Sequence, residues 1–383
     1  MADTSAIEWT DATWNPVTGC SVVSPGCTNC YAMKLAGTRL QHHPSRAGLT
    51  RDSKAGPVWT GEVRFNEDWL TQPIEWKAPR RIFVCAHGDL FHEAVPDEVI
   101  DKVFAVMAVA NHHTFQLPTK RSARMKEYLL SDDLNYRISA ALGTLLDGDW
   151  VWKAGKPHRK RIEELIERFL GHGVDRHGDS VYHDDPMPLP NVWLGVSVED
   201  QTRADERIPD LLRTPAAKRF LSCEPLLGPV DLGDISATTP TGIEQWNCLS
   251  REEAARAEIE GGDDGFIDWV IAGGESGPGA RPAHPDWVRS LRDQCQSEGV
   301  PFFFKQWGEW APGDAFGLVK ADPIVTRSGH VRDWLKLYVV CEERADRLDG
   351  HSFTTHLTNL VYRVGKARAG AMLDGREWQE MPK

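Results

Sequence analysis

The sequence lacks any run of about 18 apolar residues, which excludes a typical membrane-spanning helix. Its first residues lack the basic start and apolar stretch of a secretion signal, and the chain contains neither a repeat of fixed period nor a phosphate-binding loop of the G-x-x-x-x-G-K-S/T form. Cysteine is sparse, with 8 among 383 residues. We therefore expect a cytoplasmic protein without a membrane partner, whose cysteines are metal ligands or buried thiols rather than disulfides.

Cationic side chains are in the minority, since 44 Lys and Arg face 56 Asp and Glu and the formal net charge is −12. Taken alone, this sign argues against a nucleic-acid partner. The acidity is concentrated, however, because residues 233–268 hold nine acids and two arginines, whereas residues 31–54 hold five basic residues and one acid. The net charge therefore decides little. Nucleic acid stays open as a partner that would bind residues 34–54 and 120–126, with a solvated helix face as the alternative.

Short apolar runs alternate with helical patterns along the chain. The runs are residues 81–85, 113–117, 191–199, 218–224, 269–276 and 301–306. Such alternation predicts right-handed βαβ units and a parallel sheet. Polar residues end most of the runs, at the strand ends where a parallel barrel assembles its active site, although helix caps and turns would use the same residues. We predict an α/β fold, a partial parallel (β/α) barrel forming a single domain over residues 1–383, with peripheral insertions at about 147–190, 233–268 and 312–352.

Three of the cysteines are close together in the sequence. Cys20, Cys27 and Cys30 have the spacing C-x6-C-x2-C, while the other five are scattered. Thiolates are soft ligands suited to zinc or iron–sulfur centres, and the Pro-Gly pair before Cys27 favours a turning loop. A zinc site with His42 or His43 as fourth ligand is one alternative, and three reduced core thiols without a metal are another.

Eight short motifs carry a resemblance to a known family. They are Thr18-Gly19-Cys20, Asp89-Leu-Phe-His92, Pro118-Thr119-Lys120, Trp193-Leu-Gly-Val-Ser197-Val-Glu199, Ser222-Cys-Glu224-Pro-Leu, Gly273-Gly-Glu-Ser276, Phe304-Lys-Gln-Trp307-Gly and Gly375-Arg-Glu-Trp378. Together they resemble the phage "gene product 37 / gene product 68" family, which has no resolved function, is similar to radical S-adenosylmethionine enzymes and is a distant relative of spore photoproduct lyase.

The resemblance implies a cofactor and its ligands. Cys20, Cys27 and Cys30 would hold three irons of a 4Fe–4S cluster, leaving the fourth iron for S-adenosylmethionine. The superfamily usually has C-x3-C-x2-C, with an aromatic residue before the third cysteine where this chain has Asn29. Gly273, Gly274, Glu275 and Ser276 resemble the Gly-Gly-Glu element that contacts the amino group of the cofactor, with a plain turn as the alternative. Lys120 would pair with its carboxylate, or would simply be an exposed lysine.

The alternation of side chains along a strand places three further candidates. Valines flank Ser197 and belong against the outer helices, which turns Ser197 and Glu199 toward the interior of the barrel. By the same rule Glu224 points inward and Cys223 outward. A carboxylate in the barrel needs a partner, which the ribose hydroxyls or the charged head of S-adenosylmethionine would supply.

Two functions follow as hypotheses. The first is a radical S-adenosylmethionine enzyme that takes an electron from a donor protein, generates a 5′-deoxyadenosyl radical and acts on nucleic acid, as the resemblance to the lyase implies. The second is a non-catalytic, metal-stabilised (Fe–S or zinc) binding protein in phage–host biology. They differ in whether S-adenosylmethionine is consumed.

Overall fold

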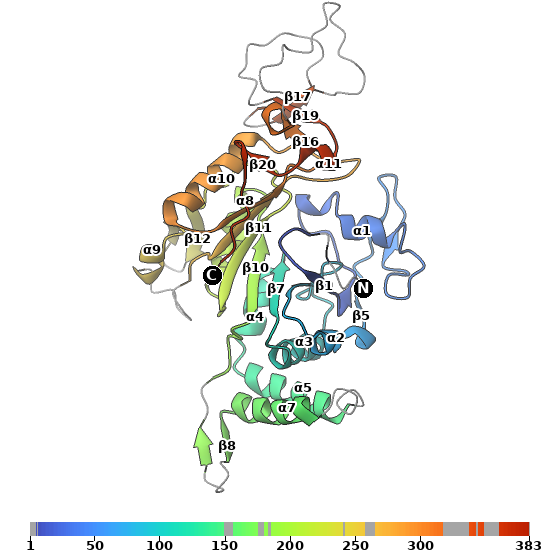
Figure 1. The fold of residues 1–383 in the computed structure, drawn as a ribbon, viewed down its shortest axis with the longest axis vertical. Helices are drawn as coiled ribbons and strands as arrows, with labels where there is room; N and C mark the ends of the chain where they lie inside the picture. Colours follow the sequence, from blue (N-terminus) through green and yellow to red (C-terminus); the bar gives the residue numbers. More distant parts are fainter. Residues whose placement is uncertain are drawn as a thin grey trace, which may run out of the picture.

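The computed structural model describes residues 5, 7–148, 156–174, 180–182, 185–239, 242–256, 265–316, 337–341, 344–347 and 360–382. Its centre is a seven-stranded sheet in which every strand runs parallel to its neighbours. The strands cross the sheet in chain order as β1 (Ala12–Trp14), β6 (Arg81–Val84), β7 (Thr114–Thr119), β10 (Val192–Ser197), β11 (Lys218–Cys223), β14 (Trp269–Gly273) and β15 (Phe302–Gln306). The sheet curls into a half-barrel (Figure 1), which confirms the predicted partial parallel (β/α) barrel.

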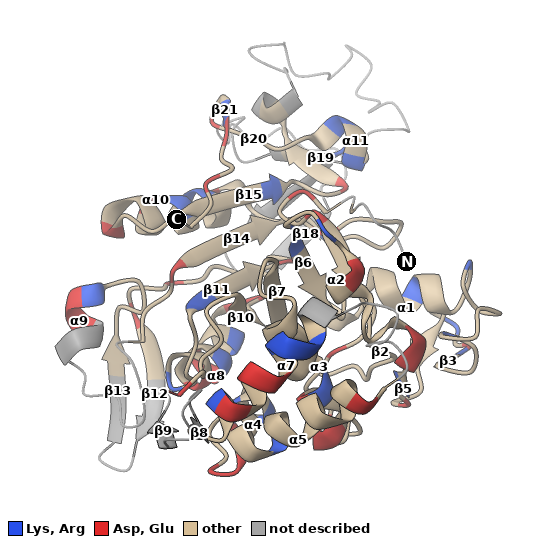
Figure 2. Cartoon of the chain, turned by 60° about the horizontal axis from the view of Figure 1, so that its bottom comes forward, with Lys and Arg blue, Asp and Glu red and all other residues tan. Residues whose placement is uncertain are grey.

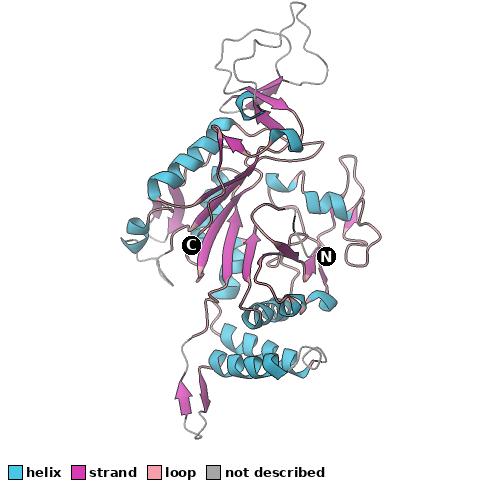
Figure 3. Ribbon diagram, viewed as in Figure 1, coloured by secondary structure: helices cyan, strands magenta, loops and turns pink. Residues whose placement is uncertain are grey.

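Helices connect the strands and pack on one face of the sheet (Figure 3); they are α3 (Asp97–Val109), α4 (Ser122–Leu129), α8 (Gln201–Leu212) and α10 (Pro285–Glu298). Two further helices, α5 (Leu134–Asp147) and α7 (Lys156–Phe169), pack on α3 and on each other. Local sequence fixes where some of these helices begin and end. The side chain of Asp200 accepts a hydrogen bond from the backbone N–H of Arg203 at 3.1 Å and caps α8, and Gly299 ends α10 with a φ of 67°.

The two faces of the sheet differ in composition, as the alternation of side chains predicts. Val196, Val198 and Cys223 belong to the large apolar core that the helices cover. The opposite face carries a separate aromatic cluster that includes Phe220 and Trp269. The predicted strand register is therefore confirmed for β10 and β11.

The two ends of the chain fill the concave side of the half-barrel. The indole of Trp9 stacks on Phe83 with a centroid distance of 5.0 Å and meets Trp269 edge-on at 6.1 Å. The indole N–H of Trp269 donates to the carbonyl of Glu380 at 2.9 Å. Because Trp269 opens β14, this packing occupies the amino-terminal half of the barrel. The carboxyl-terminal edge of the sheet is left for polar side chains.

Smaller elements surround the sheet. Beside β1 lie β2 (Val17–Thr18), η1 (Pro25–Cys27), α1 (Tyr31–Ala36), β3 (Thr50–Arg51), β4 (Val58–Trp59), β5 (Arg64–Phe65), η2 (Glu67–Trp69) and α2 (Gln72–Glu75). The segment predicted as the first insertion contains α7, β8 (His172–Val174) and β9 (Ser180–Tyr182), and the second contains β12 (Ile235–Thr239), β13 (Gly242–Trp246) and α9 (Arg251–Arg256). Residues 149–155, 175–179, 183–184, 240–241 and 257–264 of these segments lie outside the described part.

A small antiparallel sheet, a separate pair of short strands and two short helices complete the fold. They comprise β16 (Trp310–Pro312), η3 (Gly313–Phe316), β17 (Leu337–Cys341), β18 (Arg344–Arg347), β19 (Leu360–Arg363), α11 (Lys366–Ala369), β20 (Met372–Leu373) and β21 (Arg376–Glu377). Of the third predicted insertion, residues 317–336, 342–343 and 348–352 lie outside the described part. Across the helices that are described, none has the length and apolar character that a membrane crossing requires.

Candidate metal and cofactor site

The cysteine loop, residues 19–30, begins directly after β2 at the carboxyl-terminal edge of the sheet. Gly19 forms a parallel β-bridge with Gly88, which follows β6, and η1 and the start of α1 shape the other end of the loop. Cys27 is buried, while Cys20 and Cys30 are partly exposed, and all three thiols are free. Three groups of contacts bind the loop to the ends of the neighbouring strands.

The first contact holds Cys20 and Ser21. The guanidinium of Arg121 donates to Cys20 Sγ at 3.6 Å and to Ser21 Oγ at 2.7 Å. Asp89 holds this arginine through an ion pair of 3.0 Å, and His92 Nε2 lies 3.1 Å from Ser21 Oγ. The Asp89–His92 motif and the segment that follows Pro118 therefore meet at the first cysteine. Sequence reasoning treated Arg121 only as part of a basic run.

The second contact is the buried carboxylate of Glu199, which has no exposed surface. Its Oε1 accepts from Ser24 Oγ at 2.6 Å and pairs with Lys120 Nζ at 3.1 Å, and its Oε2 pairs with Arg207 Nη1 at 3.0 Å. Burial alone would raise the pKa of Glu199, but the charges of Lys120 and Arg207 outweigh it and lower that pKa. Gly26 packs so closely on this carboxylate that a Cβ would collide with it.

The third contact involves Asn29, the residue at which the loop departs from the superfamily pattern. Its amide donates to Glu275 Oε2 at 2.9 Å and to the carbonyl of Gly279 at 2.7 Å. Arg281 pairs with the same carboxylate at 2.6 Å and donates to the carbonyl of Pro25 at 3.0 Å. Burial raises the pKa of Glu275, but its hydrogen bonds with Arg281 lower it by more. No sequence signal pointed to Arg281.

Glu224 lies inside the half-barrel, as the alternation predicts. It pairs with Lys305 Nζ at 3.2 Å and accepts from the indole N–H of Trp9 at 3.3 Å. A Cβ on Gly273 would come within 2.5 Å of this carboxylate, and one on Gly274 would collide with the backbone of Trp307. The two glycines therefore allow β14 and its neighbours to approach closely at this edge.

The serines predicted at the site also lie at this edge. Ser197 and Ser222 are opposite each other in the register of β10 and β11, and both are largely buried. Ser276 Oγ accepts from the amide of Gln306 at 3.3 Å. The predicted residues thus collect around the mouth of the half-barrel, but Glu199 and Glu275 already have protein partners on both oxygens.

The thiols lie in a buried environment with cations nearby. Burial raises the pKa of Cys20 to about 12, while the charge of Arg121 acts in the opposite direction. Burial also raises the pKa of Cys30, which the charge of Lys120 opposes. Within the part of the chain that the structure describes, no group of three or more His, Cys, Asp or Glu side chains is already gathered closely enough to hold a metal ion.

The donor set nevertheless suits a metal centre. Three free thiols lie on one loop, and thiolates are soft ligands suited to zinc or iron–sulfur centres. Of the two histidines considered as a fourth zinc ligand, His42 and His43, His43 has its Nδ1 2.7 Å from Ser45 Oγ, which leaves Nε2 as the nitrogen that could bind a metal. The residues therefore fit a group with three thiolate ligands, which is the requirement of a cluster with one open iron.

Most of the predicted nucleic-acid surface at residues 120–126 is neutralised. Each basic side chain there pairs with an acid; the pairs are Lys120–Glu199, Arg121–Asp89, Arg121–Glu93, Arg124–Asp97 and Lys126–Asp210. Figure 2 shows Lys and Arg segments interspersed with Asp and Glu segments over the helices on this side. In the segment 34–54, by contrast, Arg39, Arg51 and Lys54 are exposed.

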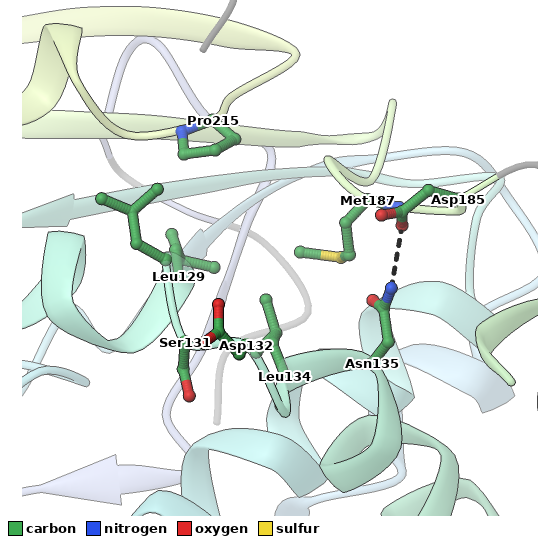
Figure 4. Close-up of a pocket in the computed structure, with 9 residues that line it drawn as sticks. Leu129, Ser131, Asp132, Leu134, Asn135, Asp185, Met187 and Pro215 are labelled. Atoms are coloured by element: carbon green, nitrogen blue, oxygen red, sulfur yellow. Dashed lines mark hydrogen bonds between the residues drawn. The ribbon is translucent and has the colours of Figure 1, made fainter. Parts of the chain in front are cut away.

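A cavity of about 310 Å³ lies elsewhere, beside the turn between α4 and α5 (Figure 4). Leu129, Leu134 and Met187 line its apolar part, and the amide of Asn135 donates to Asp185 at 3.1 Å on its rim. None of the site residues predicted from the sequence lines this cavity.

Comparison with known proteins gives one match. The family model described as "Protein of unknown function (DUF5131)" matches residues 4–382. No curated protein and no solved structure matches.

Proposed function

We propose that this chain, which belongs to the family described as "Protein of unknown function (DUF5131)", is a radical S-adenosylmethionine-type enzyme with a 4Fe–4S cluster on Cys20, Cys27 and Cys30. One observation carries the proposal. Three free thiols lie on one loop at the carboxyl-terminal edge of a parallel half-barrel, and buried contacts from four neighbouring strand ends bind that loop.

A bound, reduced cluster would supply the electron that cleaves S-adenosylmethionine into methionine and a 5′-deoxyadenosyl radical. The chain's own residues would bind the cluster and hold its loop in place. Hydrogen bonding from Arg121 to Cys20 would stabilise that ligand in its charged form. Glu199 and Glu275 hold the loop rather than the cofactor, because their oxygens are engaged by protein groups.

The polar residues of the mouth would hold S-adenosylmethionine. Ser197, Ser222 and Ser276 offer hydroxyls at the edge of the sheet, and Glu224 with Lys305 offers one charge of each sign. The aromatic cluster around Trp9 closes the amino-terminal half of the barrel and keeps water away from that side. An electron donor protein would reach the cluster at the exposed part of the loop, where Val22 and Val23 lie.

The test is cleavage of S-adenosylmethionine by the protein purified without oxygen and reduced with dithionite. We expect 5′-deoxyadenosine, and none from a Cys27→Ala variant. If the wild-type protein holds iron but releases no 5′-deoxyadenosine under any reductant, the metal is structural and the protein is the metal-stabilised binding protein of the second hypothesis.

Nucleic acid is the substrate class that we propose for this enzyme. The exposed Arg39, Arg51 and Lys54 lie in the segment that follows the cysteine loop, and Tyr31 at the end of that loop is 51% exposed. Cations bind phosphates and an exposed ring offers a base a stacking surface.

Affinity for a single-stranded oligonucleotide should fall steeply with salt and fall further when the three cations are changed to glutamine. A matched Arg124→Gln/Lys126→Gln variant should bind as wild type does, since those residues are already paired. Binding that ignores salt would contradict this assignment.

A further inference from the structure

Arg46 is a buried cation without a buried anion. The residue is 4% exposed, and its Nη1 donates to the carbonyl and the hydroxyl of Ser45 at 3.3 and 2.6 Å. Its Nε is buried and has no partner, and among the described residues no carboxylate forms an ion pair with it. Burial and the nearby charge of Arg64 lower the pKa of Arg46 to about 10. The Arg46 guanidinium lies 5.9 Å from the centre of the Trp69 ring, a cation–π contact that offsets part of the cost of burying the charge. An anion would offset more of that cost.

A second unpartnered polar group lies close to this arginine. The Nδ1 of His87 is buried and has no hydrogen-bond partner. Burial, followed by the charge of Arg46, lowers the pKa of His87 to about 4. The two side chains come from segments that meet beside β2, because Thr18 Oγ1 donates to the carbonyl of Ser45 at 2.7 Å and the N–H of Gly19 donates to the carbonyl of His87 at 3.1 Å.

Additional positive charge surrounds the pair. Arg64 donates to the carbonyls of Pro44 and Ala47, which fixes the turn that carries Arg46. In the described part of the chain Arg64 forms no ion pair with a carboxylate either. Two guanidiniums with no acid to balance them create a field that favours an anion.

The position of the group relates it to the cysteine loop. His87 follows β6, and its ring meets the ring of Tyr31 edge-on at 6.0 Å. Tyr31 follows Cys30 directly; its hydroxyl donates to the carbonyl of Ala86 at 2.6 Å, while 51% of the residue is exposed, so the ring is presented at the surface. A ligand held here would lie beside the mouth of the half-barrel.

We infer that Arg46 and His87 form a binding site for an oxyanion, the carboxylate or phosphate group of a small molecule whose remaining part contacts the ring of Tyr31. The guanidinium supplies charge and an unused N–H, and the imidazole donates from Nδ1 in the tautomer that protonates that nitrogen. None of the three cysteines takes part, so this site does not depend on the proposed cluster.

The test is thermal unfolding of the full-length chain against increasing inorganic phosphate and, separately, acetate, each compared with sodium chloride at equal ionic strength. We expect one of the two anions to raise the unfolding temperature of the wild type in a saturable manner, which identifies the chemical class of the ligand. In Arg46→Gln and His87→Gln the apparent affinity should fall at least tenfold. An Arg51→Gln variant, which removes an exposed cation from the same part of the chain, should respond as wild type does.

Two results would overturn the inference. One is a wild type that responds to neither anion beyond sodium chloride. The other concerns the stability of the anion-free protein in urea: removal of an unpaired buried charge should leave Arg46→Gln at least as stable as wild type. A variant that is clearly less stable without anion would show that Arg46 serves the fold instead.

Discussion

Glu199 connects the cysteine loop to the sheet more directly than any other residue described. Its carboxylate joins Ser24 of the loop, Lys120 after β7 and Arg207 of α8. Removing one partner from a buried charge cluster is costly, because the remaining charges stay buried without compensation. Glu199 is thus a positioning residue for the loop that carries the three thiols.

Glu199→Gln should therefore destabilise the protein by about 3 kcal/mol, since it leaves Arg207 and Lys120 without a counter-charge. Urea unfolding measures this change, and faster alkylation of Cys27 by iodoacetamide would report the loosened loop. Glu164→Gln, an exposed and isosteric change on α7, should leave both quantities unchanged. If Glu199→Gln is as stable as wild type, the carboxylate is not what holds the loop.

The lowered pKa of Glu199 fixes the pH dependence of this effect. The stability that the carboxylate contributes is fully present above the pKa of an unfolded glutamate, about 4.5, and is lost as the pH falls through the lower pKa of the folded state. The difference in unfolding free energy between wild type and Glu199→Gln should therefore be large at pH 7 and should shrink below about pH 4. A constant difference over this range would contradict the assignment.

Glu224 and Cys223 test the two faces of β11. Glu224→Gln should weaken binding or cleavage of S-adenosylmethionine by roughly tenfold at normal iron content, since it removes the charge in the mouth that pairs with Lys305. Cys223→Ser buries a hydroxyl against the helices and should cost about 1–2 kcal/mol of stability while leaving turnover in place. Loss of turnover in Cys223→Ser but not in Glu224→Gln would reverse this assignment of the faces.

Sequence periodicity predicted which faces the residues of β10 and β11 occupy. The alternation placed Cys223 in the core under the helices and Glu224, one residue past β11, inside the half-barrel. It did not predict the partners of Glu199, which lies two residues beyond β10 and accepts from Ser24, 175 positions away. Contacts of this kind depend on the fold of the whole chain and have no local signal.

At the scale of elements, six of the seven strands of the sheet are predictable because each is a short run of mainly apolar residues. β1 is only three residues long and has no such run. The insertion predicted at about 147–190 contains the amphipathic helix α7, which alternates exposed ion pairs, such as Lys160 with Glu164, with buried Ile162 and Leu165.

Ile162→Ala on α7 should destabilise the protein by about 3 kcal/mol, because the side chain is fully buried in the core that the helices share and its loss leaves a cavity. Lys160→Ala on the opposite side of the same helix should change stability by less than about 0.5 kcal/mol. Denaturant unfolding of both variants measures the contrast. Equal effects would show that α7 does not contribute its apolar face to the core.

At the scale of the whole molecule, chain order across the sheet follows from the alternation of strands and helices and was predictable. The filling of the half-barrel was not, because Trp9 and the carbonyl of Glu380 meet Trp269 from opposite ends of the chain. The net charge of the chain also did not indicate which of its charges are balanced by a partner. Charges on this chain are balanced locally in some places, as at Lys126 and Asp210, and unbalanced in others, as at Arg46.

The central claim is that the cysteine loop holds an iron–sulfur cluster, and the most direct measurement is iron and sulfide content after expression and purification without oxygen. The account predicts about four irons and four sulfides per chain, with loss of most of both in Cys20→Ala, Cys27→Ala and Cys30→Ala. Cys85→Ala, which removes a buried cysteine outside the loop, should keep the full content. Stoichiometric zinc without iron, or iron that persists when the loop cysteines are removed, would contradict the claim.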